Sequence, residues 1–591
     1  MKQSGNRNLA PAPRRDGGIG RQQIRSASPA GIAKRFRICG VMALAAALAV
    51  VVQMAPRSRV QARQLVPVQS HLAFRTKHMH AAVASGETPL MGRLPADQSL
   101  RLNIALPLRN EAALDDLLRE LYNPQSTLFH QFLSVEEFTD RFGPTQEDYD
   151  ALSRFAEENG LTITGTSPNR LLLDVTGPVA NIESAFHVAM GSYYDPVGQR
   201  TFHSADREPS ANLSVPLWHI SGLDNYSVPH PLSLRRSDAK APKLGGSGPD
   251  GMFLGSDMRA AYYGVTGPDA LTGAGQSVGL FEFAGYNQND IKRYFNTVGQ
   301  PFNVQVVGVS VDGSKLTCKG RCNDTEQVLD VEAAISMAPG MDQALVYVSD
   351  ISDVAIFNKM ATDNLAKTLS CSWGWSPADP TSDDPIFKEF MAQGQSLFAA
   401  SGDNGAFAKH TRDVYPADDP FLTAVGGTTL SIAPTTGAWR SETGWSGSGG
   451  GLSPNKIAIP AYQTVAGIIT AANQGSSTLR NVPDVAAEAD LDNYICSNGR
   501  CQGGWGGTSF AAPRWAGYMA LVNQQAVANG NPVAGFINPM IYTLGLGSTY
   551  STVFHDITVG NNNKYFANQG YDLVTGWGSP NGTGMIDALA P

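Results

Sequence analysis

The feature that most constrains the fold is an alternation of short apolar segments with longer helical ones after about residue 250. The apolar segments are Val278–Phe283, Ala344–Val348, Thr368–Ser372, Ser396–Ala400 and Leu422–Val425. Apolar runs of this length are typical of strands buried on both faces, and parallel strands need crossover helices between them. Residues 251–591 are therefore predicted to form an α/β domain whose site lies at the carboxyl ends of its strands.

A second folded unit is expected between residues 63 and 235. The alternating apolar residues that predict its strands are Leu102, Ile104, Leu106, Leu108, Leu171, Leu173 and Val175. The predicted helices are one capped by Asn110, one from Thr145 to Gly160, and one from Pro178 through Phe186. The first of these carries an apolar face of Leu114, Leu117, Leu118 and Leu121. Interleaved strands and helices predict a compact α+β unit.

Two segments outside these units have the composition of an export signal and a linker. Residues 1–62 begin with many basic side chains, continue with the uncharged run Ile38–Val52, and end in small residues at Val60–Ala62. This predicts a cleaved signal peptide and hence secretion, with a buried helix or an uncleaved, tethering anchor as alternatives and the periplasm as another destination. Residues 236–250 are basic and then rich in Gly, Ser and Pro, which predicts an exposed linker with a processing site.

Composition and cysteine usage narrow the class of protein. The chain has 591 residues, 42% hydrophobic, with a formal net charge of −8, which argues against a nucleic-acid partner. Two close cysteine pairs, Cys318–Cys322 and Cys496–Cys501, suggest local disulfides and leave Cys371 over. A zinc half-site is the alternative, but no histidine or further cysteine pair completes it.

The sharpest chemical signal is the segment GGTSFAAP at residues 506–513. A serine that follows Gly-Gly-Thr and leads into a helix places the hydroxyl and N–H of Ser509 at a helix N-terminus, where an oxyanion is stabilised. A glycine-rich turn that only caps the helix is the alternative. The segment resembles the nucleophile motif shared by subtilisins and sedolisins.

The residue that would serve as base separates these two families. Only His410 and His555 lie in the second region, and neither stands in the His-Gly-Thr frame that a subtilisin requires. Instead, Glu326 and Asp330 in EQVLD are four residues apart, which stacks both carboxylates on one helix face. A solvated acidic turn is the bland alternative. Together with GGTSFAAP, this segment resembles the sedolisins, the serine-carboxyl peptidases of the kumamolisin type.

The resemblance extends over most of the chain, through SGDNG, SCSWGW, SETGWSGSGGGLS and GYDLVTGWGSPNG. It implies a subtilisin-like parallel sheet flanked by helices, preceded by an inhibitory α+β ferredoxin-like prodomain over residues 63–235. It also implies that Ser509 attacks the peptide carbonyl, that Glu326 is general base and then acid, that Asp330 tunes the pKa of Glu326, and that Asp403 donates to the oxyanion. The further pair Glu282 and Trp373 would extend this network, the alternative being an ordinary strand-end acid and a core aromatic.

The pH logic of such a site is consistent. At pH 4 a histidine base would be only roughly 0.3% neutral, whereas a glutamate titrates near that pH. We therefore expect a secreted, acid-acting endopeptidase made as a zymogen. The alternatives are a tripeptidyl-peptidase of the same family and a catalytically silent secreted binding protein on this fold.

The resemblance also implies one calcium ion and a set of partners. The calcium ligands would be Asp556, Ile557, Asn568, Gly570 and Asp572, with two turn aspartates as the alternative. The partners would be protein or peptide substrates and the chain's own prodomain, with membrane contact only through the export segment, and we expect a monomer. Prodomain histidines, among them His187, His203, His219 and His230, would charge in acid and favour release, unless their distribution is accidental.

Overall fold

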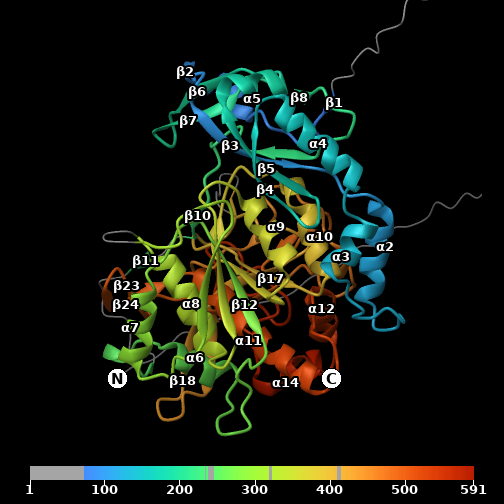
Figure 1. Cartoon of the computed structure of the whole chain (residues 1–591). Coiled ribbons are helices and arrows are strands. Elements are labelled where there is room, and N and C mark those ends of the chain that lie inside the picture. Colours follow the sequence, from blue (N-terminus) through green and yellow to red (C-terminus); the bar gives the residue numbers. More distant parts are fainter. Residues whose placement is uncertain (1–71, 233–234, 237–244, 319–322, 409–413, 591) are drawn as a thin grey trace, which may run out of the picture. The chain divides into compact units, whose positions relative to one another are not determined.

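A computed structural model describes residues 72–232, 235–236, 245–318, 323–408 and 414–590 (Figure 1). The predicted export segment, residues 1–62, lies outside the described residues. Within the described part of the chain, no helix is long and apolar enough to cross a membrane. The boundaries predicted between prodomain, linker and peptidase domain stay predictions.

The C-terminal region is built around the expected parallel sheet. Its strands follow the order β13–β14–β12–β15–β17–β18–β19, with β22 paired to a second part of β18, and all pairs except β18–β19 are parallel. The bounds are β12 Ser277–Glu282, β13 Gln305–Ser310, β14 Gln343–Val348, β15 Thr368–Cys371, β17 Ser396–Ala400, β18 Thr423–Ile432, β19 Trp439–Gly444 and β22 Val485–Glu488. The five predicted strands are β12, β14, β15, β17 and β18. The prediction missed β13, β19 and β22, which lie at or near the sheet edges and carry weaker apolar patterns.

Helices cover both faces of this sheet. Successive strand residues such as Leu280 and Phe281 belong to different core clusters, one shared with α8 and α11 and the other with α9 and α10. The helices that the site and core use are α6 Gly255–Tyr262, α7 Gln288–Val298, α8 Thr325–Met337, α9 Asp353–Asp363, α10 Asp384–Ala392 and α11 Thr508–Ala528. Every residue of α8 is buried, because α8 lies between the sheet, α11 and β23 (Asn493–Ser497).

The N-terminal unit contains two antiparallel sheets. One has the order β4–β5–β3–β9 and the other β2–β6–β7. Its main elements are β2 Leu90–Arg93, β3 Ser99–Ala105, α2 Glu111–Leu121, α3 Val135–Arg141, α4 Gln146–Glu158, β4 Thr162–Thr166, β5 Leu172–Pro178, α5 Val179–Phe186, β6 Met190–Asp195, β7 Arg200–Ala205 and β9 His219–Ser221. The predicted strands and helices are confirmed, and the unit is α+β.

Two details of this unit differ from the prediction. The helix α2 begins after Asn110 as expected, but that side chain makes no cap and donates instead to the carbonyl of Arg141. The short helix α3 was not predicted, although Ser134 and Glu137 form a capping box at its start. The leucine face of α2 packs in a cluster dominated by residues of the C-terminal region, so this helix does not belong to the unit's own core.

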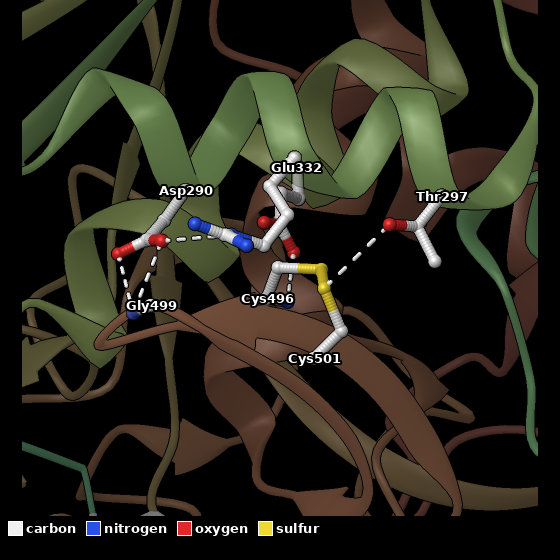
Figure 2. Close-up of a disulfide and its surroundings, with 7 residues drawn as sticks. Asp290, Thr297, Glu332, Cys496, Gly499 and Cys501 are labelled. Atoms are coloured by element: carbon white, nitrogen blue, oxygen red, sulfur yellow. Dashed lines mark hydrogen bonds and ion pairs between the residues drawn. A yellow bond between two sulfur atoms is a disulfide. The ribbon is translucent and has the colours of Figure 1, made fainter.

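A disulfide joins Cys496 in β23 to Cys501 in β24 (Arg500–Gly506), as predicted (Figure 2). The two cysteines face each other in the antiparallel register of the hairpin. Cys496 also donates its N–H to the buried Glu332 of α8. The other predicted pair includes Cys322, which lies outside the described residues, and Cys371 is a buried free thiol.

Candidate active site

Ser509 is the second residue of α11. The helix begins at Thr508 after Gly507, whose φ of 138° lets the chain turn sharply from β24 into the helix. Side chains of Ser509 and Thr508 are fully buried. The first backbone N–H groups of a helix have no intrahelical acceptor, so the turn that carries Ser509 presents donors and the positive end of the helix dipole. This is the environment predicted for the nucleophile.

The two carboxyls predicted as the acid-base pair lie one turn apart on α8, and both are buried. The Ser509 hydroxyl is close enough to Glu326 to lower the pKa of that carboxyl. Asp330 Oδ1 accepts from the Ser372 hydroxyl at 2.8 Å, and this hydroxyl lies 3.3 Å from the carbonyl oxygen of Ser509. Ser372 therefore connects Asp330 to the helix end that carries the nucleophile.

The predicted outer pair joins the same network. Glu282 is the last residue of β12, and its Oε2 accepts from Trp373 Nε1 at 2.9 Å. Glu282 also donates to Asp330, which lowers the pKa of Asp330 and raises that of Glu282. The structure thus brings together Trp373, Glu282, Asp330, Glu326 and Ser509. The carboxyl ends of parallel strands and the start of α11 meet at this point, as the fold class predicts.

Burial dominates the electrostatics of these carboxyls. It raises the pKa of Glu282, Glu326 and Asp330 well above the ordinary values, and the negative charge of Asp330 raises the pKa of Glu282 and Glu326 further. No cationic side chain within the described part of the chain contributes to these shifts. The group consequently holds protons that isolated carboxyls would release, and its charge stays low in acid.

Asp403 follows β17 and lies across from the start of α11. Its Oδ1 accepts from the backbone N–H of Thr508 at 2.6 Å and from the Thr508 hydroxyl at 2.9 Å. Its negative charge raises the pKa of Glu326 after the effects of burial, Asp330 and Glu282, so the two carboxyls lie near each other. All four residues predicted to carry the chemistry are therefore neighbours.

A segment of the chain itself crosses this site. The Ser509 hydroxyl donates to the carbonyl oxygen of Leu232 at 3.4 Å, and the N–H of Leu232 donates to the carbonyl of Ser372 at 3.1 Å. Before Leu232, β10 (His230–Pro231) pairs antiparallel with β16 (Trp373–Gly374). After it, β11 (Arg235–Arg236) pairs antiparallel with β24. The segment is held as an added strand on both sides of the nucleophile, which is a common mode of peptide binding.

Comparison with known proteins matches the N-terminal unit and the C-terminal region to two different family models. Residues 89–226 match the pro-kumamolisin activation domain, and residues 284–578 match the subtilase family. Kumamolisin of Bacillus sp. (strain MN-32) is 31% identical over 546 residues, covering 87% of this chain and 95% of that protein. The chain belongs to the sedolisin family of serine-carboxyl peptidases.

Other sedolisins are similar over a comparable length. Sedolisin of Pseudomonas sp. (strain 101) is 28% identical over 546 residues, covering 85% of this chain and 88% of that protein. Tripeptidyl-peptidase 1 of Rattus norvegicus is 25% identical over 554 residues, covering 84% and 93%. As a sedolisin, the protein is a serine-type peptidase with a subtilisin-like fold and an activation prodomain.

Sequence reasoning missed two side chains of this sedolisin site, Ser372 and Thr508. Both lie within segments that carry the family resemblance, SCSWGW and GGTSFAAP. No local pattern distinguishes them, because their partners Asp330 and Asp403 are more than 40 and 100 residues away. The neighbouring Trp373 was singled out only through the resemblance.

The residues predicted to bind calcium form one loop cluster. The N–H of Gly570 donates to Asp556 Oδ1 at 3.1 Å, and that of Asn568 donates to Asp572 Oδ2 at 2.9 Å. Asp572 is fully buried, and burial raises its pKa to about 7. No cationic side chain among the described residues contributes to the pKa of Asp556 or Asp572. Asp572 also accepts from the N–H groups of Val574 and Thr575. Two carboxylates around one loop, without a cationic partner in the described part of the chain, fit a hard cation with oxygen ligands.

Proposed function

We propose that this sedolisin is an acid-acting endopeptidase made as a zymogen, with Ser509 as nucleophile, Glu326 and Asp330 as the acid-base pair, and Asp403 in the oxyanion hole. The observation that supports this most directly is the Ser509 hydroxyl, which lies between the carboxyl of Glu326 and the peptide carbonyl of Leu232. A carbonyl at the nucleophile and a carboxyl beside it are the parts that acyl transfer needs.

In the proposed reaction, Glu326 takes the proton from Ser509 as its Oγ bonds to the carbonyl carbon. The carbonyl electrons move onto oxygen, where the Asp403 carboxylic acid and the helix N–H groups donate hydrogen bonds. Collapse of the tetrahedral intermediate breaks the C–N bond, and Glu326 gives the proton to the leaving amine. Water then hydrolyses the acyl ester by the same proton transfers in reverse.

This mechanism needs one carboxylate and at least one carboxylic acid in the same site. The raised pKa values of Glu326, Asp330 and Glu282 allow both forms to coexist in acid, because coupled carboxyls do not all ionise together. As the pH rises through these pKa values, negative charge accumulates in a buried site and the acid that donates to the oxyanion ionises. Activity should therefore fall toward neutral pH.

The path of the segment around Leu232 favours endopeptidase over tripeptidyl-peptidase activity. The chain enters through β10 and leaves through β11, so the site accommodates residues on both sides of the carbonyl at Ser509. A tripeptidyl-peptidase would stop the substrate three residues before the cut, but the chain here continues upstream of His230. We infer that the zymogen cleaves itself after Leu232, upstream of the 236–250 linker in which the sequence predicts a processing site.

The remaining parts of the proposal concern the ion and the location. Asp556 and Asp572, with the carbonyls of Ile557, Asn568 and Gly570, would hold one calcium ion, whose charge would stabilise the loop cluster near the C-terminus. Secretion through the export segment and a monomeric state complete the proposal, with peptides and the chain's own prodomain as partners.

Cleavage of an internally quenched peptide library from pH 3 to 8, after acid incubation, tests the proposal. The variants are Ser509→Ala and Glu326→Gln, with Glu332→Gln as a matched control, because Glu332 is also buried on α8 but contacts Cys496 instead of the nucleophile. We expect activity near pH 3–5 that is lost in the first two variants and kept in the control.

Other outcomes would redirect the interpretation. A maximum at pH 7–8 would contradict the carboxylate mechanism. Products released only as N-terminal tripeptides would favour a tripeptidyl-peptidase. If the folded wild type cleaves no peptide at any pH, the result would favour a binding protein.

A further inference from the structure

Thr508 donates two hydrogen bonds to a single oxygen of Asp403. The backbone N–H lies 2.6 Å and the hydroxyl 2.9 Å from Oδ1. The hydroxyl oxygen in turn accepts the N–H of Gly402 at 2.9 Å. Because that contact uses the hydroxyl as an acceptor, its hydrogen is left to point at Asp403. Thr508 is fully buried, so water does not compete for these bonds.

This pattern decides which oxygen of Asp403 can carry a proton. An oxygen that already accepts two hydrogen bonds cannot also carry a hydrogen without placing it against the hydrogens of the two donors. When Asp403 is a carboxylic acid, its hydrogen therefore resides on Oδ2. The two oxygens of one carboxyl thus have different roles, an acceptor toward Thr508 and a donor on the other side.

Gly507 provides the space for the second oxygen. A Cβ atom on Gly507 would lie 2.5 Å from Asp403 Oδ2, closer than side-chain carbons approach an oxygen. The backbone of Gly507 also has a φ of 138°, which side chains other than glycine rarely adopt. Asp403 Oδ2 therefore lies against Gly507, at the start of α11. Gly507 stands two residues before Ser509 in the chain.

We propose that Thr508 is a positioning residue that orients the Asp403 carboxylic acid so that its proton, on Oδ2, is available to the oxyanion formed at Ser509. The inference rests on the proposed function, because it assigns the geometry of the oxyanion donor in that mechanism. No proton is transferred in this step: Oδ2–H donates a hydrogen bond as the carbonyl electrons move onto oxygen. The benefit arises in the transition state, where the donor is already aligned.

The test uses the acid-activated full chain with Thr508→Val, which keeps the shape of the side chain and removes the hydroxyl, and Thr508→Ser, which keeps the hydroxyl. Rates on a quenched peptide cut by the wild type give kcat and KM separately. We expect Thr508→Val to lose roughly 10- to 100-fold in kcat, the usual effect of removing an outer partner of a site residue, with KM changed less than about twofold. Thr508→Ser should stay within about threefold of wild type.

A second variant and a folding control keep the test decisive. Circular dichroism and the thermal midpoint show whether Thr508→Val folds, and Thr508→Ala replaces it if it does not. A folded hydroxyl-free variant with wild-type kcat would overturn the positioning role, and so would a loss confined to KM or an equal loss in Thr508→Ser. None of these results would contradict the proposed peptidase activity, whereas inactivity of the wild type at every pH would contradict the proposed function itself.

Discussion

The Ser509 hydroxyl donates to the main-chain carbonyl of Leu232 across 3.4 Å, so the zymogen holds one of its own peptide carbonyls at its nucleophile. Leu232 is only 4% exposed and belongs to the core cluster of the peptidase domain. Its N–H is held by Ser372, the same residue that donates to Asp330. One residue, Ser372, thus contacts the segment at the nucleophile through its main-chain carbonyl and the acid network through its hydroxyl.

The first prediction concerns this apolar contact. Leu232→Asp should slow self-cleavage after residue 232 by roughly 100-fold or more, because an ionised or unpaired polar group enters an apolar site. Leu232→Met conserves volume and should process at nearly the wild-type rate. The N-terminus of the mature form, determined by mass spectrometry after acid incubation, reports the cut. An unchanged rate and cut position in Leu232→Asp would contradict the assignment.

A second prediction concerns Glu282, whose charge raises the pKa of Glu326 after the effects of burial and Asp330. Glu282→Gln removes that charge and retains an acceptor for Trp373, so the pKa of Glu326 should fall. The acid limb of the kcat–pH profile should then move to lower pH by about half a unit to one unit. The exposed Glu147 of α4 offers a control, Glu147→Gln, that should leave the limb in place. A profile unchanged by Glu282→Gln would show that Glu282 is only structural.

Asn169 links the prodomain to the peptidase domain and provides a third prediction. Its side-chain amide donates to Asn358 Oδ1 and to Glu389 Oε2, both at 2.7 Å, in a fully buried position. Asn169→Ala leaves these acceptors without that donor and should weaken prodomain binding by about 1–3 kcal/mol. The inhibition constant of added prodomain, compared with that of the exposed control Asn212→Ala, measures the effect. Equal constants for both variants would contradict it.

The same contact has a defined pH dependence. Burial raises the pKa of Glu389 to about 8. Its contribution to the folded, prodomain-bound state is therefore complete below its ordinary pKa and is lost as the pH rises through about 8. Glu389 favours retention of the prodomain in acid, so acid release must come from other groups.

His219 supplies a group of the opposite sign and a fourth prediction. Burial, and then the neighbouring His78, lower the pKa of His219 well below its ordinary value. The two rings stack with centroids 4.9 Å apart, Thr76 lies 2.8 Å from His219 Nδ1, and Ile220 donates its N–H to His78 Nε2. Glu208 faces the other ring nitrogen of His78. Protonation of His219 in acid would place a charge in this stack.

Because the pKa of His219 is lowered in the folded state, its contribution to the stability of that state is complete above the ordinary pKa near 6.5. This contribution is lost as the pH falls below that value. His219→Asn preserves a partner for Thr76 without charging, so prodomain release should need a pH lower by about half a unit. His203→Asn, at a partly exposed position of the same domain, serves as control. Gel filtration at a series of pH values measures the midpoint of prodomain release. Equal midpoints for His219→Asn and the wild type would show that His219 does not trigger release.

A fifth prediction concerns the loop cluster of Asp556 and Asp572. If a cation compensates these carboxylates, chelation should lower the thermal midpoint at pH 5, and calcium at 100 times its dissociation constant should restore about 2.7 kcal/mol. Asp572→Asn should abolish the response, while Asp363→Asn, on the distant helix α9, should retain it. A midpoint indifferent to calcium in the wild type would contradict the metal site.

The sequence predicted most of the peptidase sheet and its nucleophile, because these signals are local. Buried parallel strands are continuous apolar runs, the GGTSFAAP turn precedes its helix directly, and the spacing of Glu326 and Asp330 places both on one face of α8. Ser372, Thr508 and Asn169 could not be predicted this way. Asn169 and Glu389 are 220 residues apart, and no pattern in either segment indicates the other.

What the sequence alone determined is therefore most of the secondary-structure elements, the chemical groups and the family. Which groups meet was decided by the tertiary structure. The leucine face of α2 shows the distinction: its periodicity requires burial but not a particular partner, because the hydrophobic effect has no direction. The protonation of Glu326 and its neighbours has the same origin, since their pKa values depend on desolvation and on charges that only folding brings within reach.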